Sequence, residues 1–366
     1  MSKTILLVSG AAPPIIDGVG HYTARLLETL RAARPRWRWV WLTRKARWFH
    51  RPIASFRGVR IVRPAHGWYG AAPWLAGRVV RWVRPDLLHI QEQTHSFYQT
   101  DAAIRIANSA RCPVVTTVHE FHGELPGCRH TVALVERSAA VITNDGRTGR
   151  RCAEATGREP DAIWWSPSNV PPLEGASRPR TKPGLVTTFG HINVLKALDA
   201  VFEGLGQLRR RQPGLRWRLI GPTPAAPERY FDLMRNPWVE FAGGWPDLYD
   251  MRLRLALAET HVMLLPFLDG ATTRRTTLQA AWAFGLPVVT TAPELTEDAI
   301  VPEWNCLLVE PRDAVAWAGA VERILTDPAL EARLRAGSAE TARKYSWDRL
   351  ASLHLSLYDR LLGAGT

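Results

Sequence analysis

The chain has 366 residues, a length that suits two or three domains. Hydrophobic residues make up 46% of it and charged residues 22%, which excludes a disordered chain and is typical of a globular protein. Residues 1–170 hold 24 Lys and Arg against 12 Asp and Glu, whereas residues 171–366 hold 23 against 22. We therefore expect the first half to contact an anionic phospholipid surface, a nucleic acid or a charged acceptor.

The first half alternates short apolar runs with longer amphipathic ones. Strands are predicted at 4–10, 36–43, 59–64, 86–91, 113–119, 139–145 and 161–166. Helices are predicted at 20–33, 71–83, 99–109, 131–138 and 146–155. This alternation is typical of a parallel sheet with helices on both faces.

Residues 171–183 hold four prolines and few apolar residues, so they predict a linker. A second alternation follows it, and the tail at 313–362 is almost entirely helical. The predicted strands are 184–190, 215–221, 237–242, 261–266, 286–291 and 305–310, with a helix at 194–210 and others between the later strands. We predict two α/β domains of similar size that bind ligands at the carboxyl ends of their strands.

The four cysteines, Cys112, Cys128, Cys152 and Cys306, form no CxxC pair. Their spacing argues against a disulfide framework and a cysteine-rich zinc site, and it favours a reducing compartment. No apolar run approaches the roughly 18 residues that a membrane-spanning helix needs, and the apolar stretch near the N-terminus is too short for a signal peptide. We expect a soluble cytoplasmic protein.

A glycine-rich turn follows the first predicted strand. Gly18 and Gly20 lie in IIDGVGHYT, where a residue without Cβ lets the backbone approach an anion or a sugar. The two glycines do not complete the GxGxxG fingerprint of dinucleotide binding. A plain strand–helix turn is an equal alternative.

Polar side chains follow the strand at 113–119. His119, Glu120 and His122 stand where this β-branched strand emerges, a position that suits contact with a ligand. The alternative is a loop histidine that caps nearby backbone. The sequence HEFH is not HExxH, so its spacing does not suit two zinc ligands on one helical face.

The second half has a comparable strand end. The strand at 184–190 ends at Gly190, and Lys196 follows close to a predicted helix N-terminus. Free backbone N–H groups and a lysine together stabilise a phosphate. The alternative is a solvated surface lysine.

The segment 262–291 is the most informative. Asp269 follows a strand and precedes a Thr- and Arg-rich loop, where it is placed to accept hydrogen bonds from sugar hydroxyls. The residues expected to cradle a diphosphate, by their amides or side chains, are Gly270, Ala271, Thr272, Thr273, Arg274, Arg275, Thr276 and Thr277. The alternative is a helix N-cap with exposed arginines.

A basic and aromatic stretch occupies residues 31–52. The tryptophans that share one predicted strand face are Trp37, Trp39 and Trp41, and we expect them in the core. Trp48 and Phe49 lie among basic residues, which predicts contact with an anionic membrane surface. Because no RRM, KH or helix-turn-helix pattern is present, a nucleic-acid partner is not favoured.

In order and spacing, these motifs resemble the retaining family-4 glycosyltransferases of GT-B fold over nearly the whole chain. The likeness covers the Gly-Val-Gly turn, VVTTVHEFHG, FGHINVLKALD, AFGLPVV, NCLLVEPRD and the tail up to KYSWDRL. It implies a GT-B fold, with two Rossmann-like domains facing across a cleft. They would be an acceptor domain at 1–170 and a donor domain at 184–345, with a final helix at 346–366 that packs back on the first domain.

The resemblance implies a nucleotide-diphosphate sugar as donor, held mainly by the second domain, and no cofactor. Lys196 matches the phosphate-binding lysine of the family, and His191 stands where the family has an arginine. His119 matches a histidine near the transferred sugar, and Gly18 and Gly20 match the glycine loop near the donor phosphates. No Asp-x-Asp pair is present to hold a divalent ion, so a metal-free reaction is the simpler hypothesis.

The paired glutamates of the family, seven residues apart, are missing. Asp269 can take the place of the first, whereas Ala280, beside Gln279, stands in place of the second. We expect Arg274 or Arg275 to replace the cationic partner that is missing at position 191.

We therefore predict a retaining, metal-independent glycosyltransferase, with His119, Lys196 and Asp269 as its catalytic residues. The charge of the first half favours a glycan or lipid-linked acceptor of cell-envelope polysaccharide or glycolipid synthesis, used at the inner face of a membrane. The alternatives are another GT-B activity, such as an epimerase or a hydrolase, and a catalytically silent GT-B subunit that binds lipid or a partner enzyme.

Overall fold

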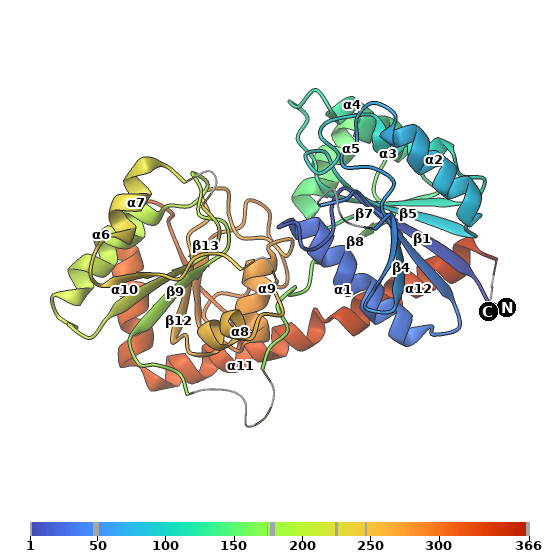
Figure 1. The fold of residues 1–366 in the computed structure, drawn as a ribbon. Helices are drawn as coiled ribbons and strands as arrows, with labels where there is room; N and C mark the ends of the chain where they lie inside the picture. The colour runs from blue at the N-terminus through green and yellow to red at the C-terminus, as the bar shows by residue number, and fades with distance from the viewer. Residues whose placement is uncertain are drawn as a thin grey trace. The chain divides into compact units, whose positions relative to one another are not determined.

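The structure is a computed structural model that describes residues 2–46, 51–173, 175, 180–223, 226–245 and 247–363. The chain divides into two compact units. The first unit combines Met1–Trp165 with Trp347–Thr366, and the second comprises Ser166–Ser346 (Figure 1). Each unit is an α/β fold built on its own sheet, as the alternation of strands and helices predicts.

The first unit contains an eight-stranded sheet in the order β3-β4-β2-β1-β5-β6-β7-β8. Its strands are β1 (Thr4–Ser9), β2 (Arg38–Leu42), β3 (Ile53–Phe56), β4 (Val59–Val62), β5 (Leu87–Gln93), β6 (Val114–Glu120), β7 (Ala140–Thr143) and β8 (Ala162–Ile163). Neighbouring strands pair in parallel, except that β3 forms an antiparallel hairpin with β4. The central strands are buried along most of their length, which is typical of a parallel sheet covered on both faces.

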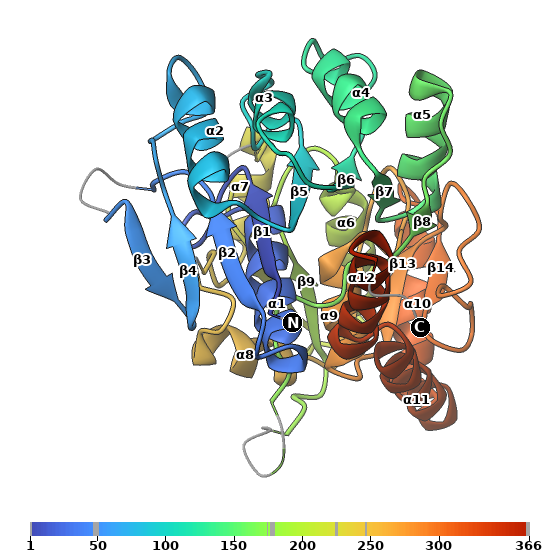
Figure 2. The same ribbon diagram turned by 90° about the vertical axis from the view of Figure 1, so that its right-hand side faces the viewer.

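Helices cover both faces of this sheet. They are α1 (Gly18–Ala33), α2 (Ala72–Val83), α3 (Ala102–Asn108), α4 (Cys128–Arg137), α5 (Gly146–Thr156) and α12 (Trp347–Leu361). Helices α2 to α5 stand in a row over one face, and α1 and α12 pack together on the other (Figure 2). The rings of Tyr22 on α1 and Trp347 on α12 lie 5.1 Å apart, so the last helix belongs to the core of the first unit.

The second unit contains a six-stranded parallel sheet in the order β11-β10-β9-β12-β13-β14. Its strands are β9 (Leu185–Phe189), β10 (Arg216–Ile220), β11 (Val239–Phe241), β12 (Val262–Leu265), β13 (Val288–Thr291) and β14 (Leu307–Val309). Alternate residues of β12 enter two separate cores: Val262 and Leu264 pack on one face, and Met263 and Leu265 on the other.

The helices of the second unit follow the same division. They are α6 (Leu198–Arg209), α7 (Glu228–Met234), α8 (Met251–Ala258), α9 (Thr276–Ala283), α10 (Ala314–Thr326) and α11 (Pro328–Lys344). Helices α6 and α10 contribute to one core, and α8 and α9 to the other. In α6, a Cβ on Gly204 would lie 3.1 Å from the backbone carbon of Ala314, so a glycine allows α6 and α10 to approach closely.

The hairpin strand β3 is the element that the sequence analysis missed. The run at 53–56 is short, and half of its residues are exposed, so its hydrophobic pattern is weak. Its turn is identifiable in the structure: Arg57 and Gly58 both have positive φ, as in the tight turns that join antiparallel strands. The strand predicted at 161–166 is also shorter, since only Ala162 and Ile163 pair with β7.

The tryptophans of the basic stretch are mainly structural. Trp39 and Trp41 are buried, as predicted, and Trp37 is half-buried just before β2. Trp41 donates a hydrogen bond from Nε1 to Ser9 Oγ (2.9 Å). Trp48 and Phe49, which the membrane prediction used, lie outside the described residues. Within the described part of the chain, no helix combines the length and the apolar character that crossing a bilayer requires.

Candidate active site

A cavity of about 210 Å³ lies at the carboxyl ends of β9 and β12 in the second unit. The first turn of α9 forms part of its wall. The lining residues are Gly190, His191, Asn193, Leu195, Lys196, Phe267, Arg274, Arg275, Thr276 and Thr277. The structure therefore brings together the two segments of this unit that the sequence singles out for phosphate binding.

Lys196 is the buried cation of this cavity. Its backbone is held by an isolated bridge to Phe267, in the segment that follows β12, and the residue is only 5% exposed. The ammonium donates a hydrogen bond to the Phe189 carbonyl oxygen (Nζ–O 3.0 Å). Burial, with a smaller contribution from the positive charge of Arg275, lowers the pKa of Lys196 to about 7. A bound anion would favour its charged form.

Gly190 creates the space in front of this ammonium. Its φ is +109°, in the region that favours glycine. A Cβ at this position would lie 2.7 Å from Thr277 Cγ2 and 3.2 Å from Lys196 Nζ. Any larger residue would therefore fill the hollow between β9 and α9.

Arg275 links the cavity to the predicted acid. It forms an ion pair with Asp269, and its guanidinium carbon lies 4.6 Å from the centre of the Phe267 ring. Asp269 is therefore engaged by an arginine, a role that the sequence analysis did not assign to it. Arg274 and His191 also line the cavity, and the His191 side chain is exposed.

The N-terminus of α9 adds a second source of positive potential. The helix begins at Thr276, so the N–H groups of Thr276 and Thr277 belong to its first turn, where no intrahelical acceptor is available. The partial positive charge at this end of a helix favours an anion. Lys196, two arginines and this helix end therefore make the cavity suitable for a phosphate group.

Two of the amides predicted to form a backbone cradle at 270–273 are bonded within the structure. The Thr273 N–H donates to a carboxylate oxygen of Glu297 (2.6 Å), and the Ala271 N–H donates to the Thr291 carbonyl (3.4 Å). Ala271 and Thr272 are buried, and these four residues do not line the cavity that Lys196 enters. Glu297 lies 24 residues beyond Thr273 in the chain, so the local motif carries no signal of this bond.

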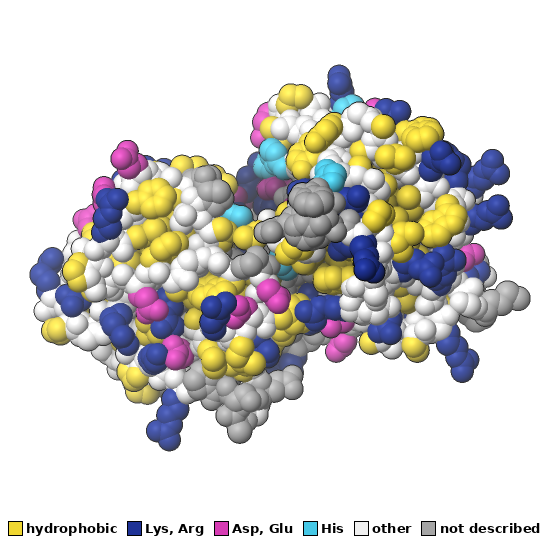
Figure 3. Space-filling model, in the orientation of Figure 1, with side chains coloured by type: hydrophobic (Ala, Val, Ile, Leu, Met, Phe, Trp, Pro, Cys, Tyr) yellow, Lys and Arg dark blue, Asp and Glu magenta, His cyan; other side chains and the backbone are white. Residues whose placement is uncertain are grey.

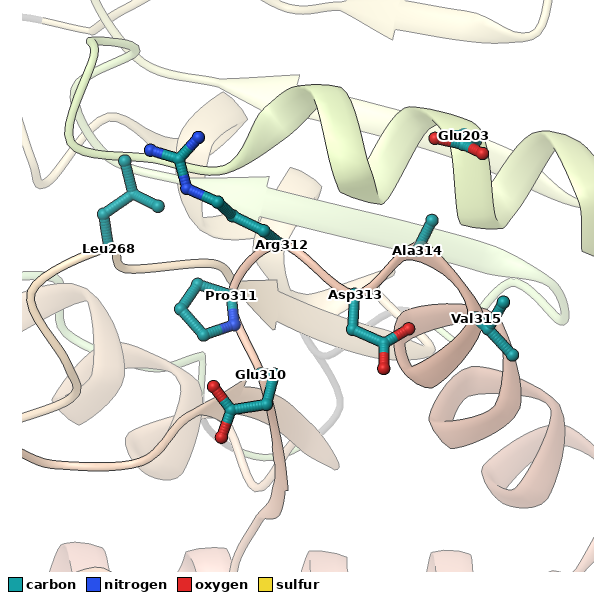
Figure 4. A pocket seen from close by; sticks show the side chains of 8 residues that line it. All are labelled: Glu203, Leu268, Glu310, Pro311, Arg312, Asp313, Ala314 and Val315. Atoms are coloured by element: carbon teal, nitrogen blue, oxygen red, sulfur yellow. The ribbon is translucent and has the colours of Figure 1, made fainter.

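Two further cavities of the second unit continue from Lys196 along α6. The first, of about 260 Å³, is lined by Lys196, Arg229 and Arg312 among others. The second, of about 710 Å³, is lined by Glu203 of α6 and by the loop from Glu310 to the start of α10. Arg312 of this loop and Leu268, both labelled in Figure 4, line both cavities. In the sequence, this loop stands out only through the family resemblance of NCLLVEPRD.

The glycine turn of the first unit is largely occupied by its own contacts. Asp17 caps α1, and its carboxylate accepts hydrogen bonds from the Gly20 N–H (2.6 Å) and Ser96 Oγ (2.7 Å). A Cβ on Gly20 would lie 2.8 Å from the Ala11 carbonyl oxygen. Gly20 is therefore required for packing, and its amide is used within the turn. Gly18 is exposed at the first position of α1.

His119 ends β6 in a buried polar network. Its Nε2 is hydrogen-bonded to Gln91 Oε1 (2.8 Å), and its ring meets that of Tyr22 edge-on at 4.7 Å. Gln91 also contacts His89, which reaches Tyr358 on α12. Burial, followed by the charges of other histidines, lowers the pKa of His89 well below its ordinary value. His119 is only 6% exposed, so most of its surface serves this network.

Across the described ranges, the structure gathers no set of three or more His, Cys, Asp or Glu residues that could hold a metal ion. The cysteines are free thiols, and three of them are buried.

Residues 183–327 match the family model "Glycosyl transferases group 1". The chain is 26% identical over 333 residues to a D-inositol 3-phosphate glycosyltransferase of Stackebrandtia nassauensis, covering 82% of this chain and 66% of that protein. It is 28% identical over 303 residues to a glycogen synthase of Mycobacterium tuberculosis, covering 75% and 69%. The chain spans only 40% of a D-inositol 3-phosphate glycosyltransferase of Nocardioides. The family model and the two inositol-phosphate relatives are named as glycosyltransferases.

Solved structures show the same fold. Sucrose-phosphate synthase from Thermosynechococcus elongatus superimposes with a TM-score of 0.78 at 19% identity, covering 99% of this chain and 100% of that one. Anabaena HepE, solved in complex with UDP and glucose, gives a TM-score of 0.72 at 15% identity, covering 97% and 99%. These matches confirm the predicted α/β architecture with two Rossmann-like domains of GT-B type.

Proposed function

We propose that this chain, whose residues 183–327 match the group 1 glycosyltransferases, transfers a sugar from a nucleotide-diphosphate sugar to an acceptor. The observation that carries the proposal is the cavity that unites Lys196, Arg274, Arg275 and the first turn of α9. Its groups are all suited to a diphosphate. HepE, a protein of similar fold, was solved in complex with UDP and glucose, which are ligands of this type.

The chemistry follows from where charge develops. Breaking the bond between a sugar and a diphosphate leaves negative charge on the departing phosphate. The Lys196 ammonium, the Arg275 guanidinium and the N-terminus of α9 stabilise that charge, because they are already oriented before the reaction and lie in a partly buried site. We propose that they do so without a metal ion and that the configuration of the sugar is retained.

The remaining predicted residues have supporting roles in this proposal. Asp269 orients Arg275 through their ion pair. His119 and Gly18 belong to the first unit, and we propose that they contact the transferred sugar and the acceptor. Lys196 has the most direct role, because its ammonium lies in the cavity itself.

We further propose a glycan or lipid-linked acceptor, used at the inner face of an anionic membrane. The support is the charge of the first unit, in which 26 Lys and Arg stand against 14 Asp and Glu. Figure 3 shows dark-blue basic side chains spread over the visible face of this unit. A surface of this kind attracts phosphate-bearing acceptors and anionic lipids.

Thermal unfolding in the presence of UDP, GDP, ADP and dTDP tests the donor proposal. Binding of one nucleotide raises the unfolding temperature by mass action, and that nucleotide identifies the base of the donor. The matching sugar nucleotide is then incubated with and without candidate acceptors, and the anomeric configuration of the product is read by NMR. Nucleotide binding without any transfer would favour the silent-subunit alternative, and no response to any nucleotide would contradict the proposal.

A further inference from the structure

The positive charge of the first unit is concentrated in one continuous segment. Residues 29–85 contain 14 Lys and Arg and no Asp or Glu. The rest of the unit therefore holds 12 basic and 14 acidic residues, a slight negative excess. The segment forms β2, β3, β4 and α2, which lie at one edge of the eight-stranded sheet (Figure 2).

A hollow of about 560 Å³ lies at this edge, beside the start of β2 and the β3–β4 turn. Its lining residues are Arg31, Pro35, Trp37, Arg38, Trp39, Ile53, Ala54, Ser55, Gly58 and Arg60. Three arginines and no acid contribute to it. None of the ten residues belongs to the second unit, so this hollow is separate from the donor cavity.

The fold holds the three arginines at the hollow from three elements. Arg31 lies in the last turn of α1, Arg38 begins β2, and Arg60 lies in β4 opposite Ser55 of β3. The turn residue Gly58 has a φ of +80°, and a Cβ there would lie 2.8 Å from the guanidinium carbon of Arg31. The glycine thus makes room for the Arg31 head group.

These three guanidinium groups have no counter-charge in the described part of the chain. Neighbouring arginines are paired: Arg34 with Asp359 (3.3 Å) and Arg57 with Glu28 (3.6 Å). Arg31, Arg38 and Arg60, in contrast, form no ion pair and no side-chain hydrogen bond with another described residue. Like charges held around one hollow repel one another, and an anion placed between them relieves that repulsion.

Two tryptophans complete the wall. The rings of Trp37 and Trp39 lie 5.7 Å apart at an angle of 31°, and Trp39 Nε1 donates to the Arg34 carbonyl (3.1 Å). They provide a rigid apolar surface next to the guanidinium groups. A phosphate ester attached to a carbon skeleton matches both parts: its phosphate meets the arginines, and its carbon atoms meet the indoles.

We propose that the Arg31–Arg38–Arg60 hollow binds the phosphate group of an organic phosphate ester, supplied by an anionic lipid headgroup or by a free molecule. This site goes beyond the donor cavity and does not depend on it. Failure of this proposal can therefore be told apart from failure of the donor proposal. UDP binding reports on the second unit, whereas binding of a phosphate ester by this hollow reports on the first.

Two double variants of the full chain test this proposal. Arg38→Gln/Arg60→Gln removes two charges from the hollow, and Arg78→Gln/Arg81→Gln removes the same charge from the exposed face of α2 as a matched control. Binding is measured to vesicles of phosphatidylglycerol and phosphatidylcholine, against phosphatidylcholine alone. Binding of free sn-glycerol 3-phosphate is measured in the Lys196→Ala background, so that the donor cavity is weakened.

We expect the hollow variant to bind its probe at least tenfold more weakly and the α2 control to lose less than about threefold, since distant surface charge is screened. Loss at anionic vesicles assigns the source to a lipid, and loss only with glycerol phosphate assigns it to a free molecule. Equal losses in the two double variants, or no binding of either probe by the parent chain, would overturn the proposal. Unchanged unfolding temperatures show that both variants fold.

Discussion

The two units place polar residues at the carboxyl ends of their strands in different ways. In the first unit, His119, Gln91, His89 and Tyr358 bind one another and are buried. In the second unit, the corresponding residues surround a cavity. A polar strand end is therefore not a binding site by itself, and the one in the second unit is better suited to a ligand.

The pKa values of the buried groups express the same difference. Burial lowers the pKa of His354 to about 4 and that of Lys196 to about 7. His354 is fully enclosed, with Nδ1 bonded to the Leu350 carbonyl (2.9 Å), so nothing from outside can restore its charge. Lys196 faces a cavity, and an entering anion can restore its charge.

Lys196→Ala gives the largest effect that this comparison predicts. We expect transfer to fall more than a hundredfold, about 3 kcal/mol of transition-state stabilisation, because the leaving diphosphate loses its buried cation. The measurement is kcat/KM with the donor identified by the nucleotide screen. The exposed Lys182, which pairs with Glu259 on the same unit, gives the control variant Lys182→Ala. Near-normal turnover of Lys196→Ala would remove the phosphate role of this residue.

Much of this arrangement is predictable from the sequence. The apolar runs identify nearly all strands of both sheets, because buried parallel strands consist of continuous Val, Ile and Leu. The pairing of Gly190 and Lys196 with Arg274 and Arg275 also follows, since the carboxyl ends of adjacent parallel strands meet at one edge.

The burial of Lys196 does not follow from the sequence, because it is produced by tertiary packing. Phe267 follows β12 and bridges to Lys196, and Tyr230 of α7 donates a hydrogen bond to the Lys196 carbonyl. The same holds for Glu297, which lies in a distant loop and accepts a hydrogen bond from the Thr273 N–H. Local pattern places residues on elements, whereas contacts between elements decide which polar groups remain available.

His119→Ala tests whether the two units have separate roles, because it separates sugar transfer from nucleotide binding. We expect kcat to fall roughly ten- to a hundredfold if His119 contacts the transferred sugar, whereas nucleotide affinity stays within about twofold of the parent, because the proposed nucleotide site lies in the second unit. The protein also becomes less stable, since Gln91 loses its buried partner.

The control for His119 is Gln91→Ala, which breaks the same hydrogen bond and leaves the imidazole in place. If both variants lose stability but only His119→Ala loses turnover, the imidazole acts on the substrate. Equal losses of turnover would show that the network, and not the imidazole, is what matters. A nucleotide affinity reduced as much as in Lys196→Ala would contradict the division of roles between the units.

The smallest predicted effect is a pH dependence with opposite signs in two measurements. Lys196 is protonated below its pKa of about 7, so affinity for the sugar nucleotide should fall, by up to about tenfold, as the pH rises from about 6 to 8. The nucleotide sugar itself is a diester without an ionisation in this range. Without ligand, this group makes the free energy of unfolding rise with pH between about 7 and 10.5, because the unfolded chain binds the extra proton.

Lys196→Met is the control for both measurements, because it keeps the length of the side chain and removes its titration. Isothermal titration with the sugar nucleotide should then give an affinity that is weak and independent of pH in this window. Denaturant unfolding should lose the rise between about 7 and 10.5. If the parent chain binds donor equally well at both ends of the range, Lys196 is charged throughout, and the cavity is more hydrated than its burial indicates. The contrast between an enclosed histidine network and an open lysine cavity would then rest on geometry alone.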